Sequence, residues 1–151
     1  MTNLERFQSL NPKVTKIRIR RDGDDITGWE LFEGEERMGY GFIIKVPDQA
    51  FNIPDSGEYD IYEVIGIADT AFRIDSLDIN LHEDYEGDLW AKEIVEDDYK
   101  SKYAGLEEVQ IRVPPDGVVD VISGSTISCD AVTKAVREKL MVLEVAFKQD
   151  M

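Results

Sequence analysis

Residues 14–46 have the sequence VTKIRIRRDGDDITGWELFEGEERMGYGFIIKV, in which apolar and polar residues alternate over three consecutive segments. The first segment ends at the dipeptide Asp22-Gly23, and the second ends at Gly34. Alternation with a period of two is typical of half-buried strands, and an Asp-Gly pair favours a hairpin turn. We therefore predict three antiparallel strands over residues 14–19, 26–32 and 38–46.

Two further strands are predicted after a polar segment at residues 47–59. Alternation of apolar residues favours strands over residues 61–67 and 72–81, with a turn between them near Asp69. In the second of these strands the apolar residues change phase by one position near Ser76. One extra residue there would restore the pattern, so we expect a β-bulge at this point.

A shorter alternation predicts one more strand in the second half of the chain. Val109, Ile111 and Val113 are separated by polar residues, and a Pro-Pro-Asp-Gly turn follows them. Proline cannot continue the hydrogen-bonding ladder of a sheet, so the turn would end the strand. We therefore expect a strand over residues 109–113.

Apolar residues spaced three and four apart predict two helices. The short helix covers residues 88–97, and the long one runs from about residue 129 to residue 147. Ser128 is the expected N-cap of the long helix, and Asp130 is expected in its first turn, where the helix dipole favours negative charge. The predicted fold class is therefore α+β, a mostly antiparallel sheet with a short helix and a long C-terminal helix packed on it.

Length and composition favour a single domain over residues 1–151. The chain has 42% hydrophobic residues, and it contains no internal repeat or linker that would divide it. One cysteine, Cys129, excludes an intramolecular disulfide. With a single histidine, His82, the chain also lacks the His/Cys cluster that zinc sites use, so no metal site is expected.

The charge of the chain is strongly negative. Lys and Arg number 17 against 32 Asp and Glu, so the formal net charge is −15. Binding to nucleic acid or to an anionic membrane depends on basic side chains, so neither is an expected partner. Partners with a basic face fit this charge better.

The sequence contains no segment that we expect to insert into a membrane. No run of apolar residues approaches the length of a transmembrane helix, and Glu5 and Arg6 stand where a signal peptide would have its apolar core. As the sequence stands, we expect a cytoplasmic protein. An extracytoplasmic location would require an anchoring segment that precedes this sequence.

The segment from Asp120 to Ser128 has the sequence DVISGSTIS, directly before the predicted long helix. A glycine among small hydroxyl residues at a helix start offers backbone N–H groups and hydroxyls that can bind a phosphate. Ser, Gly and Thr before a helix more often serve only as caps and turns. The spacing of these residues leaves both interpretations open.

The same segment resembles the flavin attachment motif of the FMN-binding domain family, found in the G and C subunits of the Rnf and Nqr electron-transport complexes. That motif has an Asp, two further residues, Ser or Thr, then Gly, Ala and Thr. Here the matching residues are Asp120, Ser123, Gly124, Ser125 and Thr126. The resemblance covers about residues 38–140, and it implies that the phosphate of FMN is esterified to Thr126.

The resemblance also implies a set of residues that contact the cofactor. In the family, the loop after the histidine lines the isoalloxazine ring, and Asp84 and Gly87 are what this chain retains of it. Ser125 stands where the family usually has Ala. The expected cofactor-binding residues are therefore Asp120, Ser123, Gly124, Ser125, Thr126, Ile127, Asp84 and Gly87.

Two functions from different classes follow. The first is a carrier of covalently bound FMN that relays electrons between redox proteins, with a flavin transferase as the partner that attaches the cofactor. A carrier needs no substrate pocket of its own, so we expect a redox carrier more than an enzyme. The alternative is an acidic interaction or assembly module that keeps the fold without flavin. A free-standing flavin reductase is disfavoured, because no G-x-G-x-x-G fingerprint for a nicotinamide dinucleotide is present.

Overall fold

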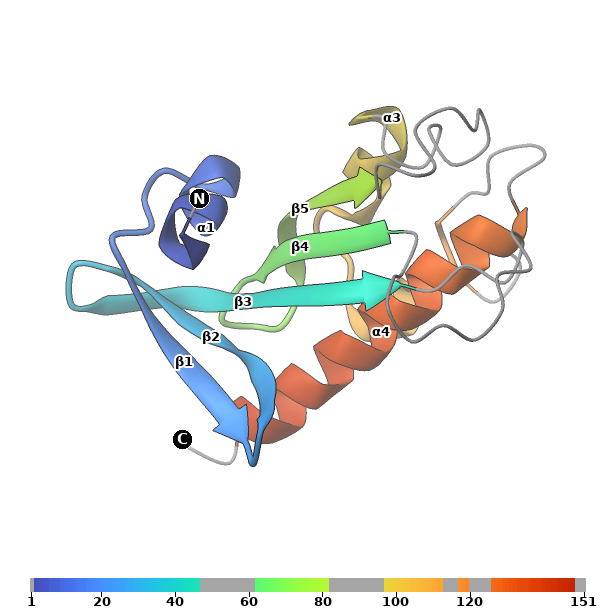
Figure 1. The fold of residues 1–151 in the computed structure, drawn as a ribbon. Coiled ribbons are helices and arrows are strands. Elements are labelled where there is room, and N and C mark those ends of the chain that lie inside the picture. Colours follow the sequence, from blue (N-terminus) through green and yellow to red (C-terminus); the bar gives the residue numbers. More distant parts are fainter. Residues whose placement is uncertain (1, 47–61, 82–96, 113–116, 120–125, 149–151) are drawn as a thin grey trace.

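The computed structural model describes residues 2–46, 62–81, 97–112, 117–119 and 126–148. In this part of the chain, five strands form one antiparallel sheet in the order β1-β2-β3-β4-β5 (Figure 1). The strands are β1 (Lys16–Asp22), β2 (Asp25–Glu33), β3 (Glu36–Val46), β4 (Tyr62–Ala68) and β5 (Ile74–Leu81). The helices are α1 (Asn3–Leu10), α3 (Asp97–Lys100) and α4 (Thr126–Lys148), with 3₁₀ turns η3 (Ser101–Tyr103) and η4 (Glu108–Gln110).

The α+β prediction is confirmed, and so are the five strands of the meander. The hairpin turn at Asp22-Gly23 is present, since Asp22 pairs with Asp25 and Gly23 has a φ of +63°. Gly34 at the next turn also has a φ of +63°. Glycine reaches this backbone region without steric cost, which explains why the chain has it at both turns.

The predicted β-bulge is also confirmed. Ile67 on β4 pairs with Ser76, whereas the next residue, Ala68, pairs with Ile74, so Asp75 is the extra residue. The bulge lets Ile74 and Leu77 both face the core although they are three positions apart. The phase change of the apolar residues therefore results from this local geometry.

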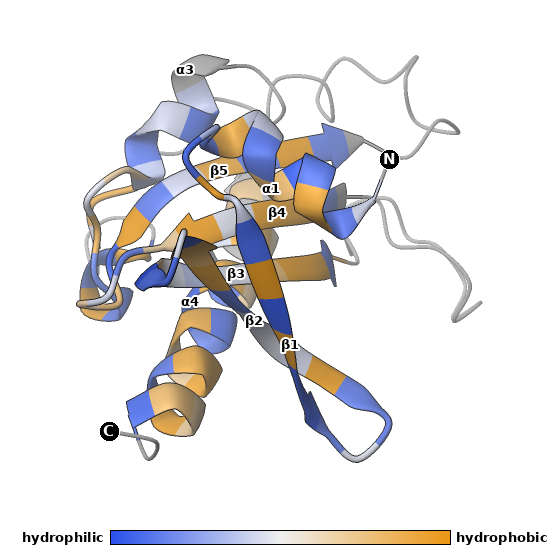
Figure 2. Ribbon diagram, turned by 90° about the vertical axis from the view of Figure 1, so that its left-hand side faces the viewer, coloured by the Kyte–Doolittle hydropathy of each residue, from blue (hydrophilic) through white to orange (hydrophobic). Residues whose placement is uncertain are grey.

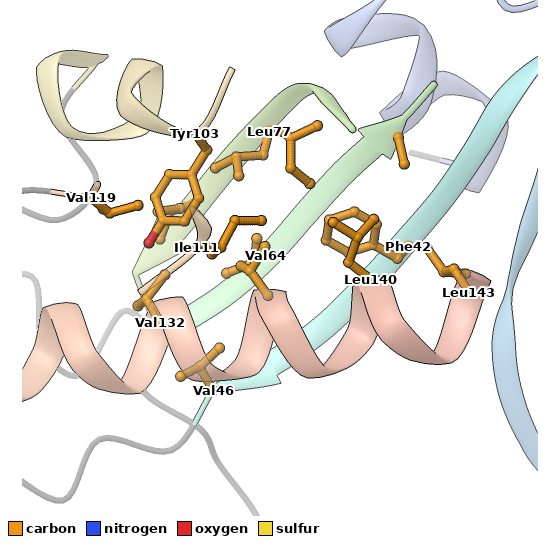
Figure 3. Packing of buried hydrophobic residues seen from close by; sticks show 14 of the residues in the cluster. Phe42, Val46, Val64, Leu77, Tyr103, Ile111, Val119, Val132, Leu140 and Leu143 are labelled. Atoms are coloured by element: carbon orange, nitrogen blue, oxygen red, sulfur yellow. The ribbon is translucent and has the colours of Figure 1, made fainter. Parts of the chain in front are cut away.

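Side chains that alternate along the strands supply two separate apolar clusters, one on each face of the sheet. The larger cluster packs under α4 and includes Phe42, Val64 and Leu140 (Figure 3). The smaller one packs under α1 and consists of Phe7, Val14, Trp29, Leu31, Ile65 and Ile67. On β4, Val64 belongs to the first cluster and its neighbour Ile65 to the second. The sheet is therefore the middle layer of three.

The strand predicted over residues 109–113 is wrong. Residues Glu108–Gln110 form the 3₁₀ turn η4, and the side chain of Gln110 accepts a hydrogen bond from the backbone N–H of Glu107. Val109 is 60% exposed while Ile111 is fully buried, so the two do not share a buried face. Three alternating apolar residues are too few to distinguish a strand from a turn with one buried side chain.

Two boundaries also differ from the prediction. The long helix α4 begins at Thr126, so Ser128 lies within the helix and is not its N-cap, and Asp130 follows the first turn. The short helix predicted over residues 88–97 falls mostly outside the described residues, and α3 begins at Asp97. The apolar spacing in α4 is confirmed by a buried stripe of Cys129, Val132, Val136, Leu140, Leu143 and Phe147.

Helix α1 was not among the predicted elements. Its N-cap is Thr2, whose hydroxyl accepts a hydrogen bond from the backbone N–H of Glu5 at 3.1 Å. The carboxylate of Glu5 accepts in return from the backbone N–H of Thr2, which completes a capping box. Phe7 is the buried residue of this helix and lies against Trp29, with ring centroids 5.4 Å apart.

Candidate functional site

The start of α4 is the part of the expected cofactor site that the structure describes. Thr126 is the first residue of the helix, and Ile127 is the second. Asp120, Ser123, Gly124 and Ser125 lie outside the described residues, as do Asp84 and Gly87. Of the expected site residues, the structure therefore describes only Thr126 and Ile127.

A phosphate fits the chemistry of this position. The first backbone N–H groups of a helix have no partner within the helix, and the aligned peptide dipoles add positive potential at that end. Thr126 places a hydroxyl residue at the first helical position of a helix that continues to Lys148. An anion bound there would meet both the N–H donors and the dipole.

A buried polar cluster fixes this end of α4 against the rest of the fold. Cys129, one turn after Thr126, is fully buried and forms a hydrogen bond with the hydroxyl of Tyr99. The hydroxyls of Tyr99 and Tyr103 are 2.8 Å apart, and the two rings meet edge to face at 5.6 Å. In Figure 3, Tyr103 lies over Val132, the next buried residue of α4. The start of the helix is thus held by packing from α3 and η3.

The environment of the two tyrosines favours their neutral forms. Burial raises the pKa of Tyr99, and the proximity of Tyr103 and Cys129 adds to the effect. Burial also raises the pKa of Tyr103, although its hydrogen bond with Tyr99 opposes the shift. Sequence inspection did not single out this pair. The available signal was the spacing of four between two tyrosines, which places them on one side of a helical turn.

Glycines of the segments that resemble the family core are explained by packing inside this fold. A Cβ on Gly41 would lie 2.6 Å from the ring of Phe7, and a Cβ on Gly66 would lie 2.2 Å from the ring of Phe42. A Cβ on Gly39 would lie 2.2 Å from the carbonyl oxygen of Ala68. All three positions therefore require glycine for close approach of neighbouring groups within the protein.

Neither a metal site nor a membrane span is present in the part of the chain that the structure describes. No group of three or more His, Cys, Asp or Glu side chains in these residues is arranged to hold a metal ion. No described helix is both long and apolar enough to cross a membrane.

Comparison with known families identifies the family of the chain. A sequence model described as the FMN-binding domain matches residues 13–141. The chain belongs to the FMN-binding domain family. The match supports FMN as the ligand, and it includes β1 and β2, which precede the region of resemblance at residues 38–140. A search among curated proteins finds no match to the chain.

The family match covers most of the described structure but not all of it. It contains the whole sheet and the first part of α4, including Thr126. Helix α1 precedes the match, and residues 142–148 at the end of α4 follow it. Both parts lie outside the matched region.

Proposed function

We propose that this protein carries FMN through a phosphoester bond to the hydroxyl oxygen Oγ1 of Thr126 and relays electrons between redox proteins. The observation that carries the proposal is the position of Thr126 as the first residue of α4 in a chain of the FMN-binding domain family. A hydroxyl at the positive end of a long helix is suited to hold a phosphate. FMN would supply the redox chemistry, and the protein would supply the attachment and its surroundings.

Attachment would require a partner enzyme that transfers the FMN half of a donor molecule to Thr126. We propose a flavin transferase that uses FAD as the donor. The oxygen Oγ1 of Thr126 would form a bond to the phosphorus of the FMN half, and the pyrophosphate P–O bond of FAD would break. AMP would leave, and the hydroxyl proton of Thr126 would pass to a base. The products are the FMN phosphoester of Thr126 and AMP, and no atom changes its oxidation state.

The packing of α4 supports a fixed attachment point. Cys129, Val132 and Val136 are fully buried in successive turns after Thr126, so the helix start has little freedom to move against the sheet. An attachment residue on such an element positions its cofactor more precisely than one in a loop would. The net charge of −15 would favour redox partners with a basic face.

Intact-mass measurement tests the attachment. Protein produced together with a flavin transferase should gain the mass of FMN less one water, and it should stay yellow after denaturation and washing. Thr126→Val removes the hydroxyl while it keeps the branched shape, so this variant should remain unmodified. Thr70→Val, at an exposed threonine outside the expected cofactor-binding residues, is the matched control and should be modified normally.

Two results would count against the proposal. A fully modified Thr126→Val variant would reject Thr126 as the acceptor. A wild-type protein that folds and stays unmodified with an active transferase would favour the other hypothesis, an acidic interaction module without flavin.

Asp120 has a separate expected role in the modification reaction. It precedes Thr126 by six positions in the sequence. We propose that its carboxylate helps to position a metal ion or the acceptor when the transferase docks. Asp120→Ala should therefore be modified slowly while its thermal midpoint stays close to that of the wild type, and unchanged modification kinetics would remove Asp120 from the site.

A further inference from the structure

Helix α3 and the turn η3 are attached to one edge of the sheet. Strand β5 is the last strand of the sheet, and Figures 1 and 2 both show α3 beside it. After η3, the backbone N–H of Gly105 donates a hydrogen bond to the carbonyl oxygen of Ile74 at 2.6 Å, and the N–H of Ile74 donates to the carbonyl oxygen of Leu106 at 2.9 Å. On α3, Lys100 forms an ion pair with Asp78 of β5 at 2.7 Å. These contacts fix the segment of α3 and η3 relative to the sheet.

A buried hydrogen bond connects this segment to the start of α4. The hydroxyl of Tyr99 on α3 bonds to the thiol of Cys129, which follows Thr126 by three positions, about one helical turn. The hydroxyl of Tyr103 bonds to that of Tyr99, so this second hydrogen bond stays within the segment of α3 and η3. Tyr99 is 1% exposed, and Tyr103 and Cys129 are fully buried. Of the two hydrogen bonds, only the one between Tyr99 and Cys129 joins the segment to α4.

We propose that the hydrogen bond between Tyr99 and Cys129 positions the first turns of α4 for flavin attachment, which makes Tyr99 a positioning residue of the site at Thr126. This inference rests on the proposed function. Apolar contacts, such as that of Tyr103 with Val132 in Figure 3, hold two segments together but are not directional, so they permit small rotations and shifts of a helix. A hydrogen bond weakens steeply when its angle changes, so it fixes orientation as well as distance.

Burial of the contact predicts which kinetic constant depends on it. A shift of α4 that separates Tyr99 from Cys129 would leave polar groups without a partner away from solvent, which is unfavourable. The reaction at Thr126 is sensitive to such a shift, because a displacement of about 1 Å can slow a reaction on the order of a hundredfold. Buried Tyr99 and Cys129 cannot contact the transferase. The hydrogen bond should therefore affect the rate of attachment and leave the binding of the transferase unchanged.

Modification kinetics with purified flavin transferase and FAD test the inference. Tyr99→Phe removes the hydroxyl and keeps the ring, so kcat for modification should fall about tenfold or more. The KM for the protein substrate should stay within about twofold of the wild-type value. Tyr103→Phe is the matched control, because it removes one hydroxyl from the same cluster and leaves the bond between Tyr99 and Cys129 in place. This control should be modified at the wild-type rate.

Variants of Cys129 test whether the two residues act through one contact. Cys129→Ala should slow modification as much as Tyr99→Phe does. The double variant should be no slower than either single variant, because the same hydrogen bond is already lost. Cys129→Ser keeps a polar partner for Tyr99 and should restore most of the rate. Circular dichroism melting checks that each variant is folded at the assay temperature.

Hydrogen exchange in the unmodified protein provides a readout that does not depend on the transferase. Amides in the first turns of α4 should exchange about tenfold faster in Tyr99→Phe than in the wild type, because the helix start is less firmly held. In Tyr103→Phe they should exchange as in the wild type. Amides around Leu140, in the second half of α4, should exchange equally in all three proteins.

Each outcome decides the inference. A Tyr99→Phe variant that is modified at the wild-type rate rejects Tyr99 as a positioning residue, while Thr126 remains the acceptor. Equal losses in Tyr99→Phe and Tyr103→Phe would mean a general loss of packing and also reject it, as would an effect on KM alone. A wild-type protein that stays unmodified with an active transferase rejects the proposed function, and this inference with it.

Discussion

The two faces of the sheet differ in how they are covered. On one face, α4 packs along the strands, and Tyr40 stacks between Phe72 and Phe147 with ring centroids 4.8 and 4.6 Å apart. On the other face, the short helix α1 contributes Phe7 as its buried residue. The first face contains most of the buried side chains, and the second is completed by a helix that precedes the family match.

This difference predicts that the cluster under α4 unfolds cooperatively with the sheet, whereas α1 can detach by itself. The α4 cluster contains residues of β3, β4, β5, α3, η3 and α4, so the loss of one of its side chains should be felt in global unfolding. Helix α1 has eight residues, which is too short to be stable in isolation. It is held by its packing and by its capping box, so it can detach in a local opening that leaves the sheet intact.

The largest effect is expected from a truncation in the α4 cluster. Leu140→Ala should lower the free energy of unfolding by about 2–5 kcal/mol, because Leu140 is fully buried and its removal leaves a cavity. Urea unfolding measures this change. The control Val109→Ala, at an exposed position, should stay within about 0.5 kcal/mol of the wild type. A loss below about 1 kcal/mol for Leu140→Ala would contradict a cooperative core on this face.

Replacing a glycine with alanine on each face of the sheet compares directly how α4 and α1 cover the two faces. Gly66→Ala would press against the ring of Phe42 inside the α4 cluster, so we expect a cost of about 1–3 kcal/mol from overpacking. Gly41→Ala would press against Phe7. Because α1 can move away, we expect a smaller global cost and faster hydrogen exchange in α1. Equal costs in urea unfolding would show that both faces are equally cooperative.

High pH should weaken the α4 face selectively. Burial raises the pKa of Tyr99 and Tyr103 above the ordinary value of 10, so the folded state keeps protons that the unfolded state releases. Stability from these groups is present below pH 10 and falls as the pH rises above it. Between pH 9 and pH 11 each tyrosine should account for a loss of about 1.4 kcal/mol.

The variant Tyr99→Phe provides the matched measurement. Its unfolding free energy should fall less between pH 9 and pH 11 than that of the wild type, by about the contribution of one tyrosine. The cluster under α1 consists of apolar side chains, so Phe7→Leu should leave the slope with pH unchanged. Identical slopes for wild type and Tyr99→Phe would contradict burial of the Tyr99 hydroxyl.

The smallest global effect is expected at the start of α1. Thr2→Ala removes the capping hydroxyl and should destabilise the helix by about 1 kcal/mol. Hydrogen exchange should become faster in α1, while the urea midpoint changes little. Thr2→Ser retains a capping hydroxyl and should preserve the protection. A large shift of the urea midpoint for Thr2→Ala would mean that α1 unfolds together with the sheet.

The strands were predictable because runs of apolar residues bounded by turn residues are typical of strands, even where, as in β4, both faces are buried. The hairpin at Gly23 has a turn signal, and the bulge at Asp75 shifts the phase of the apolar residues around it. The strand predicted at residues 109–113 failed because a turn with Ile111 buried shows the same short alternation. For α1, the signal was present as a Thr2 to Glu5 capping box, but a single buried Phe7 gives no periodicity.

In the candidate site, too, one part was predictable from the sequence and another was not. Thr126 was predicted as the attachment residue from the resemblance to a family motif, and the structure has it as the first residue of α4. The contact of Tyr99 with Cys129 joins residues thirty positions apart in the sequence. No local pattern predicts such a contact, because it depends on how α3 and α4 pack together.

The sequence by itself determined the class of fold, the five strands, the long helix and the resemblance to the FMN-binding domain family, because these follow from residue types and their spacing along the chain. The tertiary structure alone decided which glycines are needed for packing, as at Gly41 and Gly66, and which apolar residues of α4 remain exposed. Periodicity specifies the direction of a side chain relative to its own element. Whether another element covers that side depends on contacts between segments distant in the sequence, and for Val142 and Val145 no described element does so.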